Sequence, residues 1–142
     1  MVYLDTSIVA PLILPEPASE RIESLVRRIP VGDLAVSHWT RVEFAGLLAR
    51  RVRMKELARA QASRAISAFE DLLAASFHVI PPDVADFDLA VRFLERYDSG
   101  LRSGDALHLA IAQNHEARRF YTLDAKLAKA AGALNIPVHL PV

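Results

Sequence analysis

The stretch Val2-Tyr3-Leu4-Asp5-Thr6-Ser7 decides the fold, because a short apolar strand ends there in a carboxylate that is followed by two hydroxyl residues. Three more acids follow an apolar run or stand at the start of a helical one: Glu43, Asp105 and Asp124. In an open α/β sheet, groups at the carboxyl ends of the strands meet in one crevice. The sequence therefore predicts that these four acids share one site.

Apolar segments with strand-like and helix-like spacing alternate along the chain. Strands are expected at residues 2–4, 34–36, 77–80, 119–122 and 136–138, the last at a sheet edge because Pro137 lacks an amide hydrogen. A short helix limited by Pro11 and Pro15 follows the first strand. Longer helices are expected from residue 17 and over residues 40–53, 56–75, 87–97, 105–114 and 125–131. This alternation predicts an α/β fold, a three-layer α/β/α sandwich with a mostly parallel central sheet.

The composition limits the class of protein. A chain of 142 residues without a long polar stretch is expected to form one domain, residues 1–142. Cysteine is absent, which excludes disulfides and thiolate metal sites and suits the reducing cytoplasm. The first residues lack the basic region of a signal peptide, and no apolar run reaches the ~20 residues of a membrane-spanning helix. We therefore expect a cytoplasmic protein that has no membrane partner.

Basic residues are concentrated in one segment, although 17 Lys and Arg balance 17 Asp and Glu overall. Residues 41–64 contain Arg41, Arg50 and five further basic side chains against only two acids. A segment of this kind can follow a phosphate backbone and so predicts a nucleic-acid contact. The alternative, which stays open at this point, is a solvated helix face.

Each of the four acids also has an ordinary structural explanation. Asp5 can cap a helix, and Glu43 has the spacing of a capping box from Thr40. Asp105 and Asp124 can stabilise the first turns of their helices by about 0.3–1 kcal/mol. These explanations do not predict that all four acids fall at one end of the sheet. A cluster of acids repels itself unless a hard divalent cation neutralises it, so a metal-dependent enzyme is the leading hypothesis.

Several other functional motifs are missing from the sequence. It has no Gly-rich phosphate loop with a following lysine, no Gly-x-Ser-x-Gly elbow and no His-Glu-x-x-His pair. The histidines lack metal-ligand spacing, and His108, three residues after Asp105, is interpreted as a satisfied, partly buried side chain. A receiver-like phosphoacceptor signalling domain remains possible from the fold class alone.

Four segments of the chain, in this order, resemble PIN-domain ribonucleases, and specifically the toxins of VapBC-type toxin–antitoxin pairs. They are residues 2–7, residues 37–48, Leu101-Arg102-Ser103-Gly104-Asp105-Ala106-Leu107-His108-Leu109-Ala110, and Tyr121-Thr122-Leu123-Asp124. The resemblance implies a PIN-like parallel sheet between helices and an acidic Mg²⁺ or Mn²⁺ site that hydrolyses RNA phosphodiester bonds. It also implies a homodimer and an antitoxin protein whose extended or helical arm covers the site.

The resemblance also assigns roles to individual residues. The acidic catalytic and metal-binding set comprises Asp5, Glu43, Asp105 and Asp124. Asp5 and Asp105 are the principal ligands, Glu43 is a ligand or orients the attacking water, and Asp124 binds a first or second ion. Polar supports beside these acids are Thr6, Ser7 and Thr122. Their charge, and not the resemblance, suggests weaker candidates for contacts with substrate phosphates: Arg41, Arg50 and Arg102. An alternative is a PIN module that binds RNA or protein without catalysis.

Overall fold

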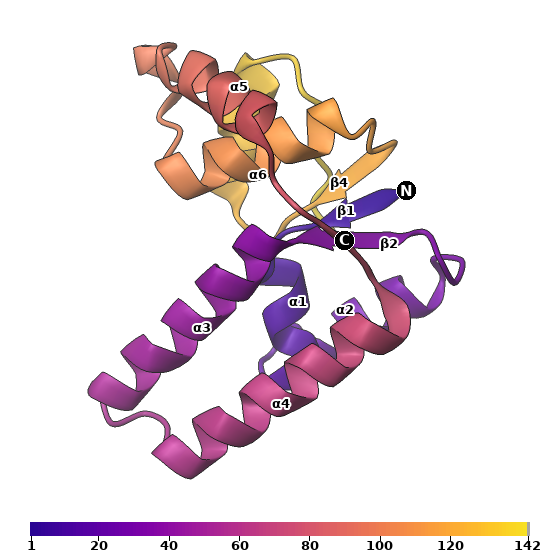
Figure 1. Cartoon of the computed structure of the whole chain (residues 1–142), viewed down its shortest axis with the longest axis vertical. Helices are drawn as coiled ribbons and strands as arrows, with labels where there is room; N and C mark the ends of the chain where they lie inside the picture. The colour runs from indigo at the N-terminus through magenta and orange to yellow at the C-terminus, as the bar shows by residue number, and fades with distance from the viewer. Residues whose placement is uncertain (142) are drawn as a thin grey trace.

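A computed structural model describes residues 1–141 and places a four-stranded sheet between two layers of helices (Figure 1). The strands are β1 (Val2–Leu4), β2 (Leu34–Ser37), β3 (His78–Ile80) and β4 (Arg119–Tyr121), in the order β3-β2-β1-β4. All three strand pairs are parallel. The predicted α/β/α sandwich with a parallel central sheet is therefore confirmed, while Val142 lies outside the described residues.

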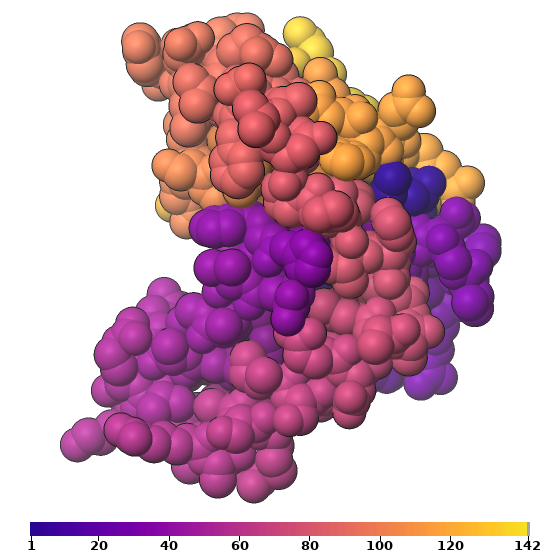
Figure 2. Space-filling view, in the orientation of Figure 1, coloured from indigo at the N-terminus to yellow at the C-terminus, as the bar shows by residue number. Residues whose placement is uncertain are grey.

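Four helices cover one face of the sheet and three cover the other (Figure 1). The first layer contains α1 (Thr6–Ile13), α2 (Ser19–Arg27), α3 (His38–Arg53) and α4 (Arg59–Ser76). The second contains α5 (Val84–Leu94), α6 (Ser103–Asn114) and α7 (Ala125–Ala133), with a 3-10 turn at Tyr97–Ser99. The α3–α4 pair stands out from the body of the molecule (Figure 2). No helix among residues 1–141 is long and apolar enough to cross a membrane.

The central strands β1 and β2 are buried on both faces because successive side chains enter different cores. In β1, Val2 and Leu4 join the core under α1–α4, whereas Tyr3 between them joins the core under α5–α7. Such two-sided burial is typical of parallel strands that helices cover on both faces. Tyr3 thereby places a phenol hydroxyl inside the second layer, against α6.

The sheet has a topological switch point beside β1. The chain passes from β1 outward to β2 and β3, and then returns to form β4 on the other side of β1. Ligands of open α/β sheets bind outside the carboxyl ends of the strands at such a point. A receiver-like sheet has the order 2-1-3-4-5, in which β1 lies between β2 and β3. Here β1 lies between β2 and β4, so the receiver-like alternative is wrong.

One sequence prediction near the C-terminus is also wrong, and the predicted end of one helix differs from the structure. No strand forms at residues 136–138, because Pro137 cannot donate to a ladder, and only a single bridge joins Tyr121 to His139. The helix predicted over residues 125–131 extends to Ala133, so Gly132 lies inside it. Near the N-terminus, α1 passes through Pro11 and ends just before Pro15, where the preceding residue Leu14 is extended as prolines favour.

Candidate active site

One cleft of about 590 Å³ lies where the carboxyl ends of β1 and β4 meet α3 and α6, and all four acids line it. They come from separate parts of the chain: Asp5 follows β1, Glu43 lies on α3, Asp105 on the first turn of α6, and Asp124 before α7. The cleft is also lined by Thr6, Ser7, Ala10, Glu16, Gly46, Leu47, Arg50, Arg102, His108 and Leu123. The geometry therefore brings the four acids together, and their role as metal ligands remains a prediction.

Asp5 both caps α1 and faces the cleft. Its Oδ1 accepts hydrogen bonds from the Ile8 amide at 3.2 Å and the Ser7 hydroxyl at 2.6 Å, while the Thr122 hydroxyl donates to Oδ2 at 2.6 Å. The side chain is 4% exposed, and this burial raises the pKa of the carboxyl although the hydrogen bonds and His108 oppose it. Each carboxylate oxygen has more than one lone pair, so a cap can also bind a cation.

Glu43 has no part in capping α3. That cap is formed by Ser37 and Thr40, because the Thr40 hydroxyl accepts from the Ser37 amide at 3.3 Å. Glu43 instead turns its Oε2 to His108 Nε2 at 2.6 Å and accepts a short hydrogen bond from the Thr6 hydroxyl. Burial would raise the pKa of Glu43, but the hydrogen bonds and the electrostatic attraction of His108 outweigh it and lower that pKa. The carboxylate is therefore held in its charged form.

Asp105 and Asp124 are bridged by one guanidinium group. Arg102 donates from Nε to Asp105 Oδ2 at 2.9 Å and from a terminal nitrogen to Asp124 Oδ2 at 2.7 Å. Burial raises the pKa of Asp105, with a further contribution from Asp124, although Arg102 opposes this shift. Asp124 also caps α7 through the amides of Lys126 and Leu127. A cation between these two carboxylates is thus favourable, and in this structure Arg102 supplies it.

The donor set fits a hard divalent cation. Carboxylate and hydroxyl oxygens surround the cleft, and Mg²⁺ or Mn²⁺ prefers such oxygen ligands to sulfur or nitrogen. Thr6, Ser7 and Thr122 contact the acids as supports: Thr6 binds Glu43, while Ser7 and Thr122 bind Asp5.

The arginine candidates separate into two groups. Arg50 and Arg102 line the cleft, whereas Arg41 is not among its described lining residues and pairs with Glu70 on α4 at 2.9 Å. Arg51 also has a partner, because its guanidinium lies 2.6 Å from Glu16 at the cleft. The structure thus places Arg50 and Arg102 at the cleft and Arg41 outside its described lining, and contacts of these arginines with substrate phosphates stay a prediction.

The sequence did not predict that His108 lies at the cleft. Its side chain is 2% exposed and fully hydrogen-bonded, as expected, yet it lines the cleft and contacts Glu43. The available signal was its spacing of three residues from Asp105 on an otherwise apolar helix. Gly104 was also missed: a Cβ placed there would lie 2.8 Å from Glu43 Oε1, which no sequence pattern reveals.

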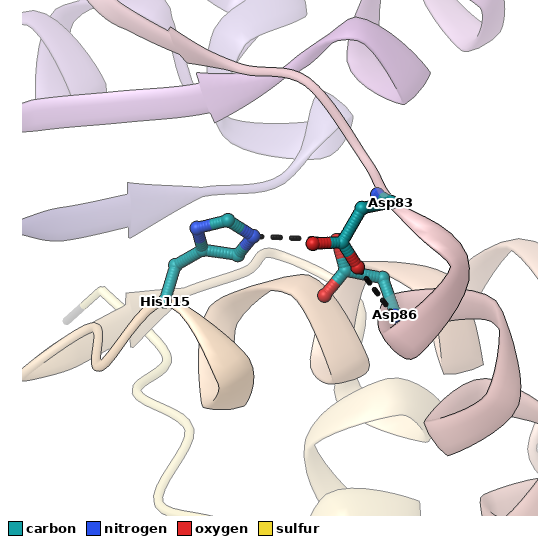
Figure 3. Close-up of side chains that lie close together, drawn as sticks. All are labelled: Asp83, Asp86 and His115. Atoms are coloured by element: carbon teal, nitrogen blue, oxygen red, sulfur yellow. Dashed lines mark hydrogen bonds and ion pairs between the residues drawn. The ribbon is translucent and has the colours of Figure 1, made fainter.

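A second acidic group lies at the other end of α6 (Figure 3). Ligand atoms of Asp83, Asp86 and His115 all lie within 4.8 Å of one another. Asp83 and Asp86 form the capping box of α5, and the buried Asp86 also accepts from Asn114 at 2.8 Å and lies 3.3 Å from His115. His115 is ten residues from Asp105, about 15 Å along a helix. These contacts tie the start of α5 to the end of α6 and account for the group without a ligand.

Comparison with known proteins agrees with this geometry. A family model described as the PIN domain matches residues 2–133. Similar solved structures include VapC20 of Mycobacterium tuberculosis, a sarcin–ricin loop cleaving toxin (TM-score 0.75, 21% identity, covering 92% of this chain and 95% of that chain). FitAcB from Neisseria gonorrhoeae is also similar (TM-score 0.73, 19% identity, 99% and 98% covered). So is VapBC-1 from nontypeable Haemophilus influenzae (TM-score 0.70, 17% identity, 98% and 97% covered).

At these identities the likeness to solved structures concerns the fold. No curated protein sequence matches the chain. The family model, in contrast, covers nearly all of the sequence, including the four acids of the cleft. This chain belongs to the PIN domain family.

Proposed function

We propose that this protein is an endoribonuclease that depends on Mg²⁺ or Mn²⁺ and acts as the toxin of a toxin–antitoxin pair. The observation that carries the proposal is the meeting of four carboxylates from four separate segments in one cleft at the sheet's switch point. The alternative, a PIN module that binds RNA or protein without catalysis, has no need of these four acids.

Each residue of the cleft has a separate role in the proposed reaction. Asp5 and Asp105 would hold the ion, with Asp124 as a further ligand of that ion or a second one. When bound, the ion would stabilise the negative charge on the phosphate oxygens and lower the pKa of a water molecule. Glu43 would be a further ligand of the ion and would orient the attacking water, whose oxygen forms a bond to phosphorus while the bond from phosphorus to the leaving sugar oxygen breaks. The water gives up a proton to solvent, and the leaving sugar oxygen takes one up from solvent. Arg50 contacts a flanking phosphate, and Arg102 does so once it leaves its acidic partners.

The proposed partners follow from the same site. Toxin–antitoxin assemblies are among the similar structures, one of them a complex from Klebsiella pneumoniae with a TM-score of 0.68. We propose RNA as the substrate, an antitoxin protein that covers the cleft, the cytoplasm as the location, and one nuclease domain over residues 1–142. We also propose a homodimer, and an exposed apolar stripe on α5 at Val84, Phe87 and Val91 offers a contact surface. A monomer mass in light scattering would contradict the dimer.

The experiment that tests the function is cleavage of a mixed RNA pool in the presence and absence of Mg²⁺ or Mn²⁺, with wild type beside the Asp5→Asn variant. Cleavage by the wild type alone, and only with metal, supports the nuclease. RNA binding without cleavage at any metal concentration would favour the silent module.

Metal should raise the thermal stability of the wild type. An ion that binds the folded cleft and not the unfolded chain stabilises by mass action, by about 2.7 kcal/mol at 100 times its Kd. The increase in Tm should disappear in Asp5→Asn, which differential scanning fluorimetry can measure. A Tm that does not change in millimolar Mn²⁺ would contradict the proposed metal site.

The affinity for metal should increase with pH. The pKa values of Asp5 and Asp105 are both raised, so these acids keep protons above the usual carboxyl range, and the ion must displace them. Mn²⁺ affinity should therefore rise as pH increases from the usual carboxyl pKa through the raised values, and then level off. Isothermal titration at several pH values checks this, since a flat profile would show that binding releases no protons.

Arg50→Ala should weaken RNA binding and make it less sensitive to salt. Each phosphate contact with single-stranded nucleic acid contributes roughly 0.7 units to the slope of log affinity against log salt. Binding is measured in Ca²⁺ to suppress cleavage. The matched control is Arg41→Ala on the same helix, whose guanidinium pairs with Glu70 outside the cleft. An affinity and a slope for Arg50→Ala that are both unchanged from the wild type would identify the basic segment as a solvated face.

A further inference from the structure

We propose that His108 is a positioning residue that fixes the Glu43 carboxylate, and that Tyr3 and Ser37 in turn fix the His108 ring. The proposal rests on the nuclease function proposed above, because it concerns the same cleft. It goes beyond that function by giving roles to three buried side chains that are neither metal ligands nor phosphate contacts.

A continuous hydrogen-bond chain runs from the sheet to the cleft. Ser37 Oγ at the end of β2 lies 2.9 Å from the Tyr3 hydroxyl, which lies 2.7 Å from His108 Nδ1. On the other side of the ring, His108 Nε2 lies 2.6 Å from Glu43 Oε2. The first three residues are buried, so solvent does not compete for these bonds. The chain links β1, β2, α6 and α3 through one imidazole.

The protons of this chain can be arranged in two ways. In the first arrangement, the Tyr3 hydroxyl donates to Ser37, and the Tyr3 oxygen accepts a hydrogen bond from Nδ1–H of His108. Because Nε2 faces the Glu43 carboxylate, which can only accept, His108 must then carry a second proton on Nε2. If Ser37 donates to Tyr3, then Tyr3 donates to Nδ1, and the single ring proton lies on Nε2. Both arrangements direct an N–H from Nε2 to Glu43. The proposal depends only on this shared feature.

Glu43 needs such support because its side chain has three rotatable bonds and lies partly exposed on α3. The Thr6 hydroxyl holds the same oxygen, Oε2, that His108 holds. The other oxygen, Oε1, lies against Gly104, where a Cβ would approach it to 2.8 Å. His108 and Thr6 therefore fix one oxygen while the bare backbone of α6 leaves room for the other. Groups that orient ligands in this way typically change metal affinity or activity by 10–100-fold.

A purely structural role for His108 makes different predictions. The ring packs edge-on against Tyr3, with centroids 5.7 Å apart, so it could serve only to fill the layer under α6. A residue that only fills space can be replaced by an apolar side chain of similar size. A residue that positions Glu43 can be replaced only by another donor in the place of Nε2.

The test compares His108→Gln, whose amide N–H reaches the place of Nε2, with His108→Met, which has similar length and no donor. We expect His108→Met to lower kcat for RNA cleavage by roughly 10–100-fold with little change in KM, and to weaken Mn²⁺ binding measured by electron paramagnetic resonance. His108→Gln should recover most of both losses. Tyr3→Phe, which keeps the ring and removes one hydroxyl, should give an intermediate kcat.

Two outcomes would overturn the proposal. One is a His108→Met variant with wild-type kcat and Mn²⁺ affinity, and the other is a His108→Gln variant as impaired as His108→Met. Wild type and Asp5→Asn are measured beside them. If neither cleaves RNA, the nuclease proposal fails by itself, and the Mn²⁺ titrations still decide whether His108 positions Glu43.

Discussion

Asp5→Asn should abolish metal-dependent RNA cleavage while the protein stays folded. The change removes one ligand charge from the deepest acid of the cleft, and a bound metal contributes several kcal/mol to the transition state, so a loss of roughly 10³-fold or more is expected. The fold should survive because the amide oxygen can still accept from the Ile8 amide and the Ser7 hydroxyl, which now bind Oδ1. Asn and Asp are also about equal as helix caps.

The metal-free Asp5→Asn protein should be at least as stable as the parent. Burial raises the pKa of Asp5, which means that the folded state holds this proton more tightly than the unfolded state. The protonated Asp5 carboxyl therefore contributes to the stability of the folded state at low pH, and this contribution is lost as pH rises through the raised pKa. An asparagine has no such loss at neutral pH. Asp83→Asn is the matched control, since Asp83 also caps a helix but lies outside the cleft. Nuclease activity in Asp5→Asn equal to that of the control would refute the assignment.

The strand–helix alternation could be predicted from sequence because burial on both faces gives the central strands β1 and β2 apolar runs, at residues 2–4 and 34–36. The run before Asp5 and the run before Asp124 both became strands, and their adjacency as β1 and β4 joins the two acids. The amide of Asp5 even donates to the carbonyl of Tyr121 at 3.3 Å. The pairing of β1 with β4 depends on the order of strands in the sheet, and the apolar pattern of a single strand does not reveal that order.

Local sequence patterns could not identify the partners of Glu43, Arg41 and His108, because long-range contacts decide them. The spacing of Thr40 and Glu43 is that of a capping box. In the structure, however, the Thr40 hydroxyl accepts a hydrogen bond from the Ser37 amide, so Glu43 does not cap α3 and its side chain lies at the cleft. Arg41 lay in the basic segment, but an acid on α4 pairs with it. His108 was correctly expected to be satisfied, but its partners Tyr3 and Glu43 are 105 and 65 residues away. No local pattern identifies partners at such separations.

Gly104→Ala should lower cleavage strongly without unfolding the protein. The added Cβ would lie 2.8 Å from Glu43 Oε1 and 3.3 Å from Trp39 Cζ2, so the Glu43 carboxylate must move. That carboxylate is the end of a flexible side chain, so the fold can absorb the shift, but its Oε2 cannot then keep both His108 and Thr6. A misplacement of about 1 Å near the chemistry can cost 10²-fold, and we expect kcat to fall by about that factor.

The stability of the same variant separates a displaced carboxylate from a damaged helix. Gly104 lies in α6, where alanine is favoured over glycine by up to about 1 kcal/mol, so the change is opposed by the contact with Trp39 at 3.3 Å and, above all, by the closer contact with Glu43. Gly132→Ala on α7 is the control, because a Cβ there meets nothing within 4 Å, and its kcat should stay at the wild-type value. In a Glu43→Ala background the contact is gone, so Gly104→Ala should stabilise more than it does in the wild type, a non-additivity that urea denaturation can measure. Equal effects in both backgrounds would show that Gly104 does not make room for Glu43, and the loss of activity would then need another cause.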